Sequence, residues 1–331
     1  MKNIRDAVLI ELQKYQESGE FVSGQDLAER CDVTRTTVWK VINDLRDEGC
    51  SIEAISNRGY RLLADNSFDK RNILKYLDKS TGAKVMFFNT IDSTNSEAKR
   101  LLIQEGYKKL HKTVIASSYQ TDGKGRQGRH FYSPVNTGVY FSIIYSSPAI
   151  TDPAIITAST AVAINHAIKQ IFDVDTQIKW INDIYIKNKK IAGVLTEGIT
   201  DLESRKVEAI IIGIGINVTL SNDMPPSVKK NAGSILKDSQ TVKRSQLCAA
   251  SVNEVIRILE GGDKVIKETL KEYKELSNIL GKEIEVTPLD GEKSQKYKCT
   301  AVDITDNAQL KVLLPDGSSR LLSSGEVTLH K

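Results

Sequence analysis

The chain has 331 residues, of which 40% are hydrophobic and 27% are charged. This composition excludes wholesale disorder, and the length predicts two or three domains rather than a single core. No apolar run approaches the ~20 residues of a membrane span, and the first residues lack the apolar core of a signal peptide. We therefore expect a cytoplasmic protein with no membrane segment.

Charge is unevenly distributed along the chain. The formal net charge is +4, yet residues 1–63 hold nine Lys or Arg against eleven Asp or Glu. The four cysteines are scattered, and the four histidines form no cluster with ligand spacing, so we expect reduced thiols and no metal site.

Residues 1–64 have the pattern of a winged helix-turn-helix. Apolar spacing predicts a helix over 4–15, a second helix begins near 23 and a third spans 34–45, followed by a hairpin over 51–63 with its tip at 57–59. The third helix has the polar outer face of a DNA recognition helix. The expected DNA-binding residues are Ser23, Thr34, Arg35, Thr36, Thr37, Lys40 and Arg58.

A three-helix bundle with a hairpin also serves protein contacts, so that alternative stays open. Phosphate neutralisation supplies most non-specific affinity for DNA, and this module is acidic overall. One module alone should therefore bind DNA weakly. A dimer that presents two recognition helices would remedy this.

The central part, 65–277, mixes strands and helices. We expect a strand over 84–89, a helix opened by a capping box at Thr94–Glu97, and a long helix from Pro153 to Phe172. Further strands are expected near 179–180, 184–186, 191–196 and 208–218. Short turns between successive strands favour a mixed, largely antiparallel sheet.

The segment Gly123–Arg129, with the sequence GKGRQGR, is typical of a loop that holds an anion. Glycine allows close approach of the backbone, and the cations supply charge. The segment matches G-x-G-x-x-G and nearly matches a P-loop, but both motifs need a helix after the glycines. Here a strand, Val139–Tyr145, follows, so we reject both. A mobile solvated loop remains the alternative.

Residues 278–331 read as a small antiparallel barrel. Two helices, over 247–259 and 265–276, precede it. Short strands follow at 283–287, 297–302, 310–314 and 320–322, with turns at 290–291 and 315–317.

Four segments together resemble the biotin–protein ligases and, with the N-terminal module, the bifunctional biotin ligase and biotin-operon repressors. They are DSTN at 92–95, GKGRQGR at 123–129, KWIND at 179–183 and KIAG at 190–193. The resemblance covers the whole chain and implies an SH3-like C-terminal barrel. Lys124 replaces a usual arginine, Ile181 a usual proline and Phe131 a common tryptophan, from which we expect altered affinity rather than lost function.

The resemblance implies that biotin and ATP form biotinyl-5′-AMP, whose acyl group passes to a lysine of a biotin carboxyl carrier protein. Mg²⁺ is expected with ATP. Arg126, Lys190 and Asp183 are implied as catalytic, with Asp183 assisting deprotonation of the acceptor lysine. The residues implied to bind biotin or the adenylate are Ser93, Thr94, Asn95, Gln120, Gly123, Lys124, Gly125, Arg126, Phe131, Trp180, Asn182, Lys190 and Gly193.

The same resemblance implies repression of biotin genes, with operator DNA as a partner and the adenylate as corepressor of a homodimer. Two alternatives stay open. A transcription factor that only senses a small acid would explain residues 1–63 but not the cations of the glycine-rich segment. A lipoate ligase has a related fold, but its arginine-pair and triple-glycine segment is absent here.

Overall fold

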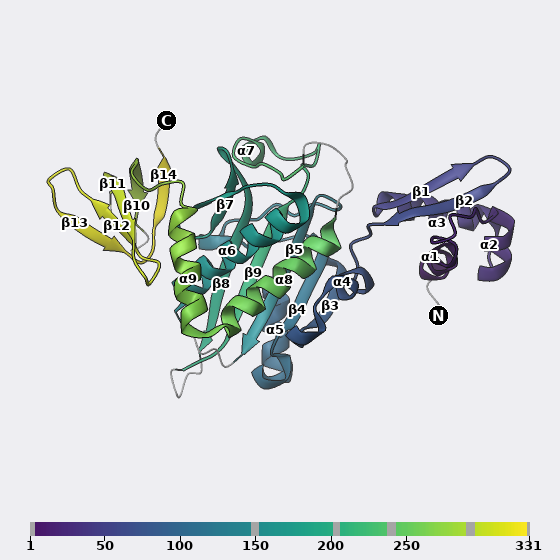
Figure 1. Ribbon diagram of the computed structural model, residues 1–331, viewed down its shortest axis with the longest axis horizontal. Coiled ribbons are helices and arrows are strands. Elements are labelled where there is room, and N and C mark those ends of the chain that lie inside the picture. The colour runs from purple at the N-terminus through teal and green to yellow at the C-terminus, as the bar shows by residue number, and fades with distance from the viewer. Residues whose placement is uncertain (1–3, 147–151, 201–205, 237–242, 289–294, 330–331) are drawn as a thin grey trace.

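The computed structural model describes residues 4–146, 152–200, 206–236, 243–288 and 295–329. Three parts lie in a row along the long axis of the molecule (Figure 1). The N-terminal module lies at one end, a sheet covered by helices forms the body, and a smaller sheet lies at the other end. The predicted domain limits, after residues 64 and 277, stay predictions.

The N-terminal module is the predicted winged helix-turn-helix. Its elements are α1 (Ile4–Lys14), α2 (Gly24–Cys31), α3 (Arg35–Asp47), β1 (Cys50–Ile55) and β2 (Gly59–Asp65), and the two strands pair antiparallel. The side chains that point inward from the three helices and the hairpin form a separate apolar cluster. The module therefore has a core of its own.

Local caps define the helix-turn-helix. The Ser23 hydroxyl accepts a hydrogen bond from the backbone N–H of Asp26 at the start of α2. Thr34 accepts one from the N–H of Thr37 at the start of α3. Asp32, with φ of 54°, ends α2 in the left-handed region. Each cap satisfies helix-end groups that would otherwise lack a partner.

The body is built on a mixed, largely antiparallel seven-stranded sheet, as predicted. The strand order is β3-β4-β5-β9-β8-β7-β6, and among the strands described β3 and β4 are the one parallel pair. The apolar residues of β9 are buried on both faces of the sheet, which explains the lack of alternation in its sequence. The strands are β3 (Lys84–Ile91), β4 (Thr113–Gln120), β5 (Gly138–Ser146), β6 (Gln177–Lys179), β7 (Asp183–Ile186), β8 (Lys189–Thr200) and β9 (Val207–Asn217).

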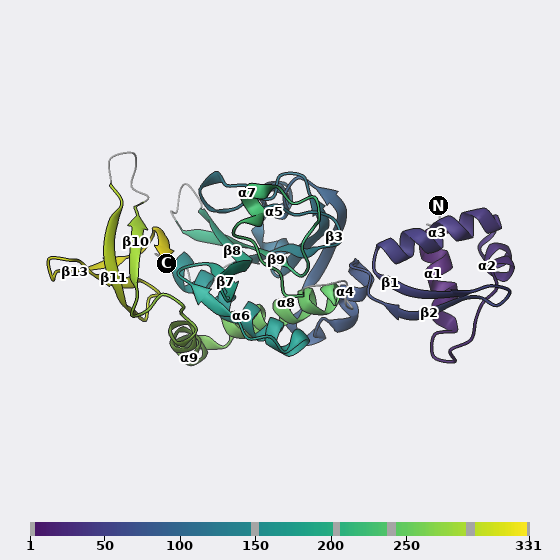
Figure 2. The same ribbon diagram turned by 90° about the horizontal axis from the view of Figure 1, so that it is seen from above.

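Helices cover both faces of this sheet. The long helices α6 and α8 contact one face, with α9 beside α6, and α5 covers the opposite face against β4, β5 and β9 (Figure 2). The predicted limits of α6 are confirmed, and Asp152 caps its first turn. The capping box at Thr94 is wrong by one residue, because Ser93 caps α5. The helices are α4 (Lys70–Tyr76), α5 (Thr94–Glu105), α6 (Pro153–Phe172), α7 (Pro226–Lys229), α8 (Arg244–Glu260) and α9 (Gly262–Glu275).

The C-terminal part is a five-stranded antiparallel sheet in the order β13-β12-β11-β10-β14. No pairing between β13 and β14 closes it among the residues described, so the barrel stays a prediction. The turn expected at 290–291 lies outside the described residues. The last strand was not predicted from the sequence. The strands are β10 (Glu283–Thr287), β11 (Tyr297–Ile304), β12 (Leu310–Leu313), β13 (Ser319–Leu322) and β14 (Glu326–Leu329).

Candidate functional site

A pocket in the body gathers most of the residues predicted to bind a ligand. It opens between the start of α5, the glycine-rich segment and strands β8 and β9. Segments that lie up to 122 positions apart, from Ser93 to Gly215, therefore meet in one place. The predicted residues that line it are Ser93, Thr94, Asn95, Gln120, Lys124, Gly125, Arg126, Phe131, Asn182, Lys190 and Gly193.

One wall of the pocket is polar, buried and fixed by hydrogen bonds. The Thr94 backbone N–H donates to Gln120 Oε1 at 2.9 Å, and Gln120 Nε2 donates to Ser133 Oγ at 2.8 Å. Asn95 Nδ2 donates to Glu197 Oε2 at 2.8 Å. Because these buried groups hold one another in place, the wall is preorganised for a small polar ring. Neither Ser133 nor Glu197 was expected from the sequence.

Glycines form the floor. Gly193 of β8 pairs with Gly215 of β9, and Gly213 points to the same face two residues earlier. A Cβ at Gly213 would lie 2.1 Å from Asn95 Oδ1, and one at Gly215 would lie 2.5 Å from the Phe131 ring. The strand must lack side chains here for the wall to approach it. The alternation of glycine with isoleucine at residues 212–216 of β9 was the available signal, but from the sequence we expected only a strand there.

Cations also line the pocket. Arg126 Nη1 donates to Asn182 Oδ1 at 3.0 Å, which directs the guanidinium toward the pocket. Lys190 Nζ forms an ion pair with Asp183 Oδ1 at 2.6 Å, and both side chains are partly exposed. An anion that enters the pocket thus meets an arginine and a lysine held by neutral or acidic partners.

The glycine-rich segment forms a short, closed turn between β4 and β5. The Gly125 N–H donates to Arg129 O at 2.7 Å, and the Phe131 N–H donates to Gly123 O at 2.7 Å. Only a single 3-10 turn, at Arg126–Gly128, lies within it. No helix begins after the glycines, and β5 follows at residue 138, which agrees with our rejection of the dinucleotide and P-loop motifs.

Two cations of this segment have carboxylate partners. Lys124 pairs with Asp122. Arg129, which does not line the pocket, forms a two-pronged ion pair with Glu326 of β14, with both N–O distances at 2.6 Å. The glycine-rich segment is thereby tied to the C-terminal sheet.

Three predicted residues lie outside the pocket lining. Trp180 is 4% exposed, and its Nε1 donates to Ala308 O at 2.8 Å, so it joins the body to the C-terminal sheet. A Cβ at Gly123 would lie 2.5 Å from Phe131 O, so that glycine is needed for the close approach of two backbone segments. Asp183 forms an ion pair with Lys190 and does not itself line the pocket.

Lys179 was not selected from the sequence, although it belongs to the segment 179–183. Burial is the main cause that lowers the pKa of its ammonium, and the neighbouring positive charge of Lys190 adds to this. Asp183 opposes the shift. Shifted ionisable groups are typical of functional sites, but Lys179 itself does not line the pocket.

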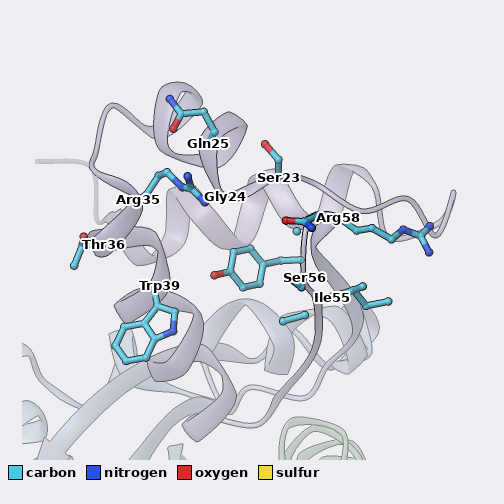
Figure 3. A pocket seen from close by; sticks show the side chains of 13 residues that line it. Ser23, Gly24, Gln25, Arg35, Thr36, Trp39, Ile55, Ser56 and Arg58 are labelled. Carbon is cyan, nitrogen blue, oxygen red and sulfur yellow. The ribbon is translucent and has the colours of Figure 1, made fainter.

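A second hollow lies between the recognition helix and the wing of the N-terminal module (Figure 3). Arg35 and Thr36 of α3, Ser23 before α2, and Arg58 at the wing tip line it, and its lining contains no Asp or Glu. The Arg58 guanidinium lies 4.5 Å from the centre of the Phe21 ring. An acidic module thus has a locally basic face, which is the footprint expected for a nucleic-acid contact.

The other predicted DNA-binding residues have different surroundings. The hydroxyls of Thr34 and Thr37 lie 2.9 Å apart and serve the helix cap. Lys40 is exposed on α3 and does not line the hollow.

Within the described part of the chain, none of the helices combines the length and hydropathy that a membrane-spanning segment needs.

Comparisons with known proteins identify a family for two parts of the chain. Residues 87–217 match the biotin/lipoate A/B protein ligase family, and residues 10–61 match an HTH domain. The chain is 35% identical over 235 residues to the bifunctional ligase/repressor BirA of Bacillus subtilis (strain 168), covering 69% of each chain. It is 27% identical over 273 residues to BirA of Escherichia coli (strain K12), covering 81% of this chain and 82% of that one.

A solved structure supports the fold. The biotin protein ligase from Aquifex aeolicus in complex with biotin and ATP superposes with a TM-score of 0.60 at 23% identity. It covers 75% of this chain and 99% of that chain.

Proposed function

Since the chain belongs to the bifunctional ligase/repressor family, we propose how its residues carry out the two activities of that family. The protein is a biotin–protein ligase and a DNA-binding repressor. As a ligase it joins biotin to AMP at the expense of ATP and transfers biotin to a lysine of a carrier protein. One observation carries the proposal: a preorganised polar wall and a set of cations line the same pocket, which has a floor of glycines.

The polar wall binds biotin in this proposal. Thr94, Asn95 and Gln120 hydrogen-bond the ureido ring or its neighbouring polar groups, and Phe131 packs on the apolar part. The floor at Gly213 and Gly215 leaves room for the ligand to lie against the sheet. The biotin carboxylate then points toward the cations.

The cations allow two anions to meet. The biotin carboxylate attacks the α-phosphorus of ATP, a P–O bond forms, and pyrophosphate leaves. At about 4 Å and an effective dielectric constant near 20, two like charges repel by roughly 4 kcal/mol. Lys124, Arg126 and Lys190 offset this repulsion and stabilise the charge that develops. No enzyme nucleophile is required.

The second step attaches biotin to the carrier. The ε-amine of the acceptor lysine attacks the carbonyl carbon of the adenylate, an amide forms, and AMP leaves. That amine starts as an ammonium with a pKa of about 10.4. We assign Asp183, paired with Lys190, to receive its proton, and Asn182 to the nucleotide side.

Mg²⁺ enters with ATP in this account. Among the described residues no group of His, Cys, Asp and Glu is arranged to hold a metal ion. Phosphate oxygens are ligands that Mg²⁺ prefers, so ATP itself supplies most of its coordination. The glycine-rich segment orders over the adenylate and excludes water that would hydrolyse it.

The C-terminal sheet and the N-terminal module complete the proposal. The sheet closes into an SH3-like barrel that helps the nucleotide and the carrier to bind, and its Arg129–Glu326 link to the glycine-rich segment supports that role. Adenylate binding favours a homodimer, which presents two DNA modules to an operator. Sedimentation with and without biotin and ATP tests this, and a ligand-independent mass would refute the coupling.

Mass spectrometry of a biotin carrier domain tests the ligase reaction. Incubation with the chain, biotin and ATP should add one biotinyl group per acceptor lysine. A matched reaction with lipoate in place of biotin should leave the carrier unmodified. Modification by lipoate alone would favour lipoate ligation, and binding of biotin with no pyrophosphate release would favour a sensor without ligase activity.

A further inference from the structure

The recognition helix carries an exposed tryptophan that has no part in the ligase reaction. Trp39 is 57% exposed, whereas the other tryptophan of the chain, Trp180, is 4% exposed. Val38 and Ile42 of the same helix are fully buried in the module core, so Trp39 is directed away from that core. A large aromatic side chain gains much from burial, which makes an exposed one a candidate contact for a partner.

Trp39 shares its helix face with two predicted DNA-binding residues. It follows Arg35 by four positions and Thr36 by three, so the three side chains are neighbours on α3. All three line the hollow of about 820 Å³ between α3 and the wing. Figure 3 shows them on one side of the hollow, with Ser56 and Arg58 of the wing on the other. The face thus combines a cation, a hydroxyl and an apolar ring.

These chemistries match different features of DNA. Phosphates and polar base edges attract the guanidinium and the hydroxyl. An indole face gains little from phosphate oxygens, whereas the C5-methyl of thymine is the apolar group that the major groove presents. The N-terminal half of a recognition helix is the part that contacts base edges. Trp39 lies in that half, since α3 runs from Arg35 to Asp47.

We propose that Trp39 is a sequence-reading residue whose indole packs against the C5-methyl of thymine in the major groove of the operator. This inference rests on the repressor function proposed above and makes it more specific. Arg35 and Thr36 supply the polar contacts beside it. Replacing thymine by deoxyuridine removes only that methyl group, so the proposal can be tested at the level of a single carbon atom.

The experiment begins with duplexes selected from a random-sequence pool by the full chain with biotin and ATP present. Each thymine of a selected duplex is then replaced by deoxyuridine, one position at a time, and affinity is measured by fluorescence anisotropy. We expect one or two positions at which the substitution lowers the affinity of wild type roughly three- to tenfold, which corresponds to the burial of one methyl group. Trp39→Ala should bind more weakly and should not distinguish thymine from deoxyuridine at those positions. Trp39→Phe should keep part of the discrimination.

A control separates base reading from phosphate binding. Lys40→Ala should weaken binding to all duplexes alike and lower the salt dependence, while the thymine preference persists. Adenylate formation by each variant checks that the ligase body is intact. Uniform insensitivity of wild type to deoxyuridine, or unchanged discrimination by Trp39→Ala, would overturn the inference while leaving repression in place. Failure of wild type to select any duplex would instead remove the repressor function and the inference with it.

Discussion

Lys190→Ala should slow adenylate formation strongly and leave the fold intact. The ammonium faces a pocket in which a carboxylate must reach a phosphate, and it is the partner of Asp183 at 2.6 Å. A full charge contact at about 4 Å is worth roughly 4 kcal/mol at an effective dielectric constant near 20. The side chain is one-third exposed, at 33%, so water screens part of that energy. A loss of about 2 to 3 kcal/mol corresponds to a rate roughly 30- to 160-fold slower.

The assay is pyrophosphate release from biotin and ATP with no carrier present, which isolates the first step. Lys190→Ala also leaves the Asp183 carboxylate without its cation near the phosphates. The double variant with Asp183→Asn should therefore regain part of the lost rate, whereas two independent effects would add. An unchanged rate of pyrophosphate release in Lys190→Ala would refute the assignment of this lysine to the reaction.

Three other contacts in the structure can be tested by substitution. Gly213→Ala should weaken biotin binding in calorimetry with little effect on ATP, because the new Cβ would lie 2.1 Å from Asn95 Oδ1. Arg126→Gly should fold normally, yet rapid filtration should find the adenylate in solution, because the guanidinium that covers it is gone. His166 Nδ1 lies 3.1 Å from Glu254 Oε2. This carboxylate and a second one raise the pKa of the His166 imidazole, so its protonated form stabilises the fold. The free energy of unfolding, measured by urea denaturation, should include this full contribution below the histidine's unfolded pKa of about 6.5. The contribution should be lost as pH rises through the raised pKa of the folded state, and His166→Asn should remove this dependence on pH.

Each of these predictions has an outcome that contradicts it. Equal biotin affinity in Gly213→Ala would mean that the floor does not position Asn95. Retention of the adenylate by Arg126→Gly would exclude the covering role of that loop. A stability that does not change with pH in wild type, or the same slope in His166→Asn, would show that the histidine bridge contributes nothing measurable.

Local patterns in the sequence predicted the elements well where local chemistry determines them. The helices α2 and α3 begin within one residue of the expected positions, where Ser23 and Thr34 cap them, and the long helix begins at Pro153 as predicted. The grouping of four distant segments into one pocket also followed from the sequence, but only through the family resemblance. Spacing along the chain contains no information on which loops meet across a sheet.

Long-range contacts account for the features that could not be predicted from the sequence. Trp180 bonds to Ala308, 128 positions away, and Arg129 bonds to Glu326, 197 positions away. Tryptophan and arginine are both common in ligand sites. Their partners here lie in the C-terminal sheet, so they could be identified only from the arrangement of that sheet beside the body. The glycine floor is different, because glycines at every second position of β9 are visible in the sequence. They indicate that another part of the chain lies close above that face of the strand.

The central claim is that clustered cations let a carboxylate and a triphosphate meet in one pocket. Its most direct test is the product formed when the purified chain is given biotin and ATP with no acceptor protein. We expect chromatography and mass spectrometry to find biotinyl-5′-AMP held by the protein, with one pyrophosphate released for each adenylate. Binding of both substrates with neither adenylate nor pyrophosphate produced would contradict it.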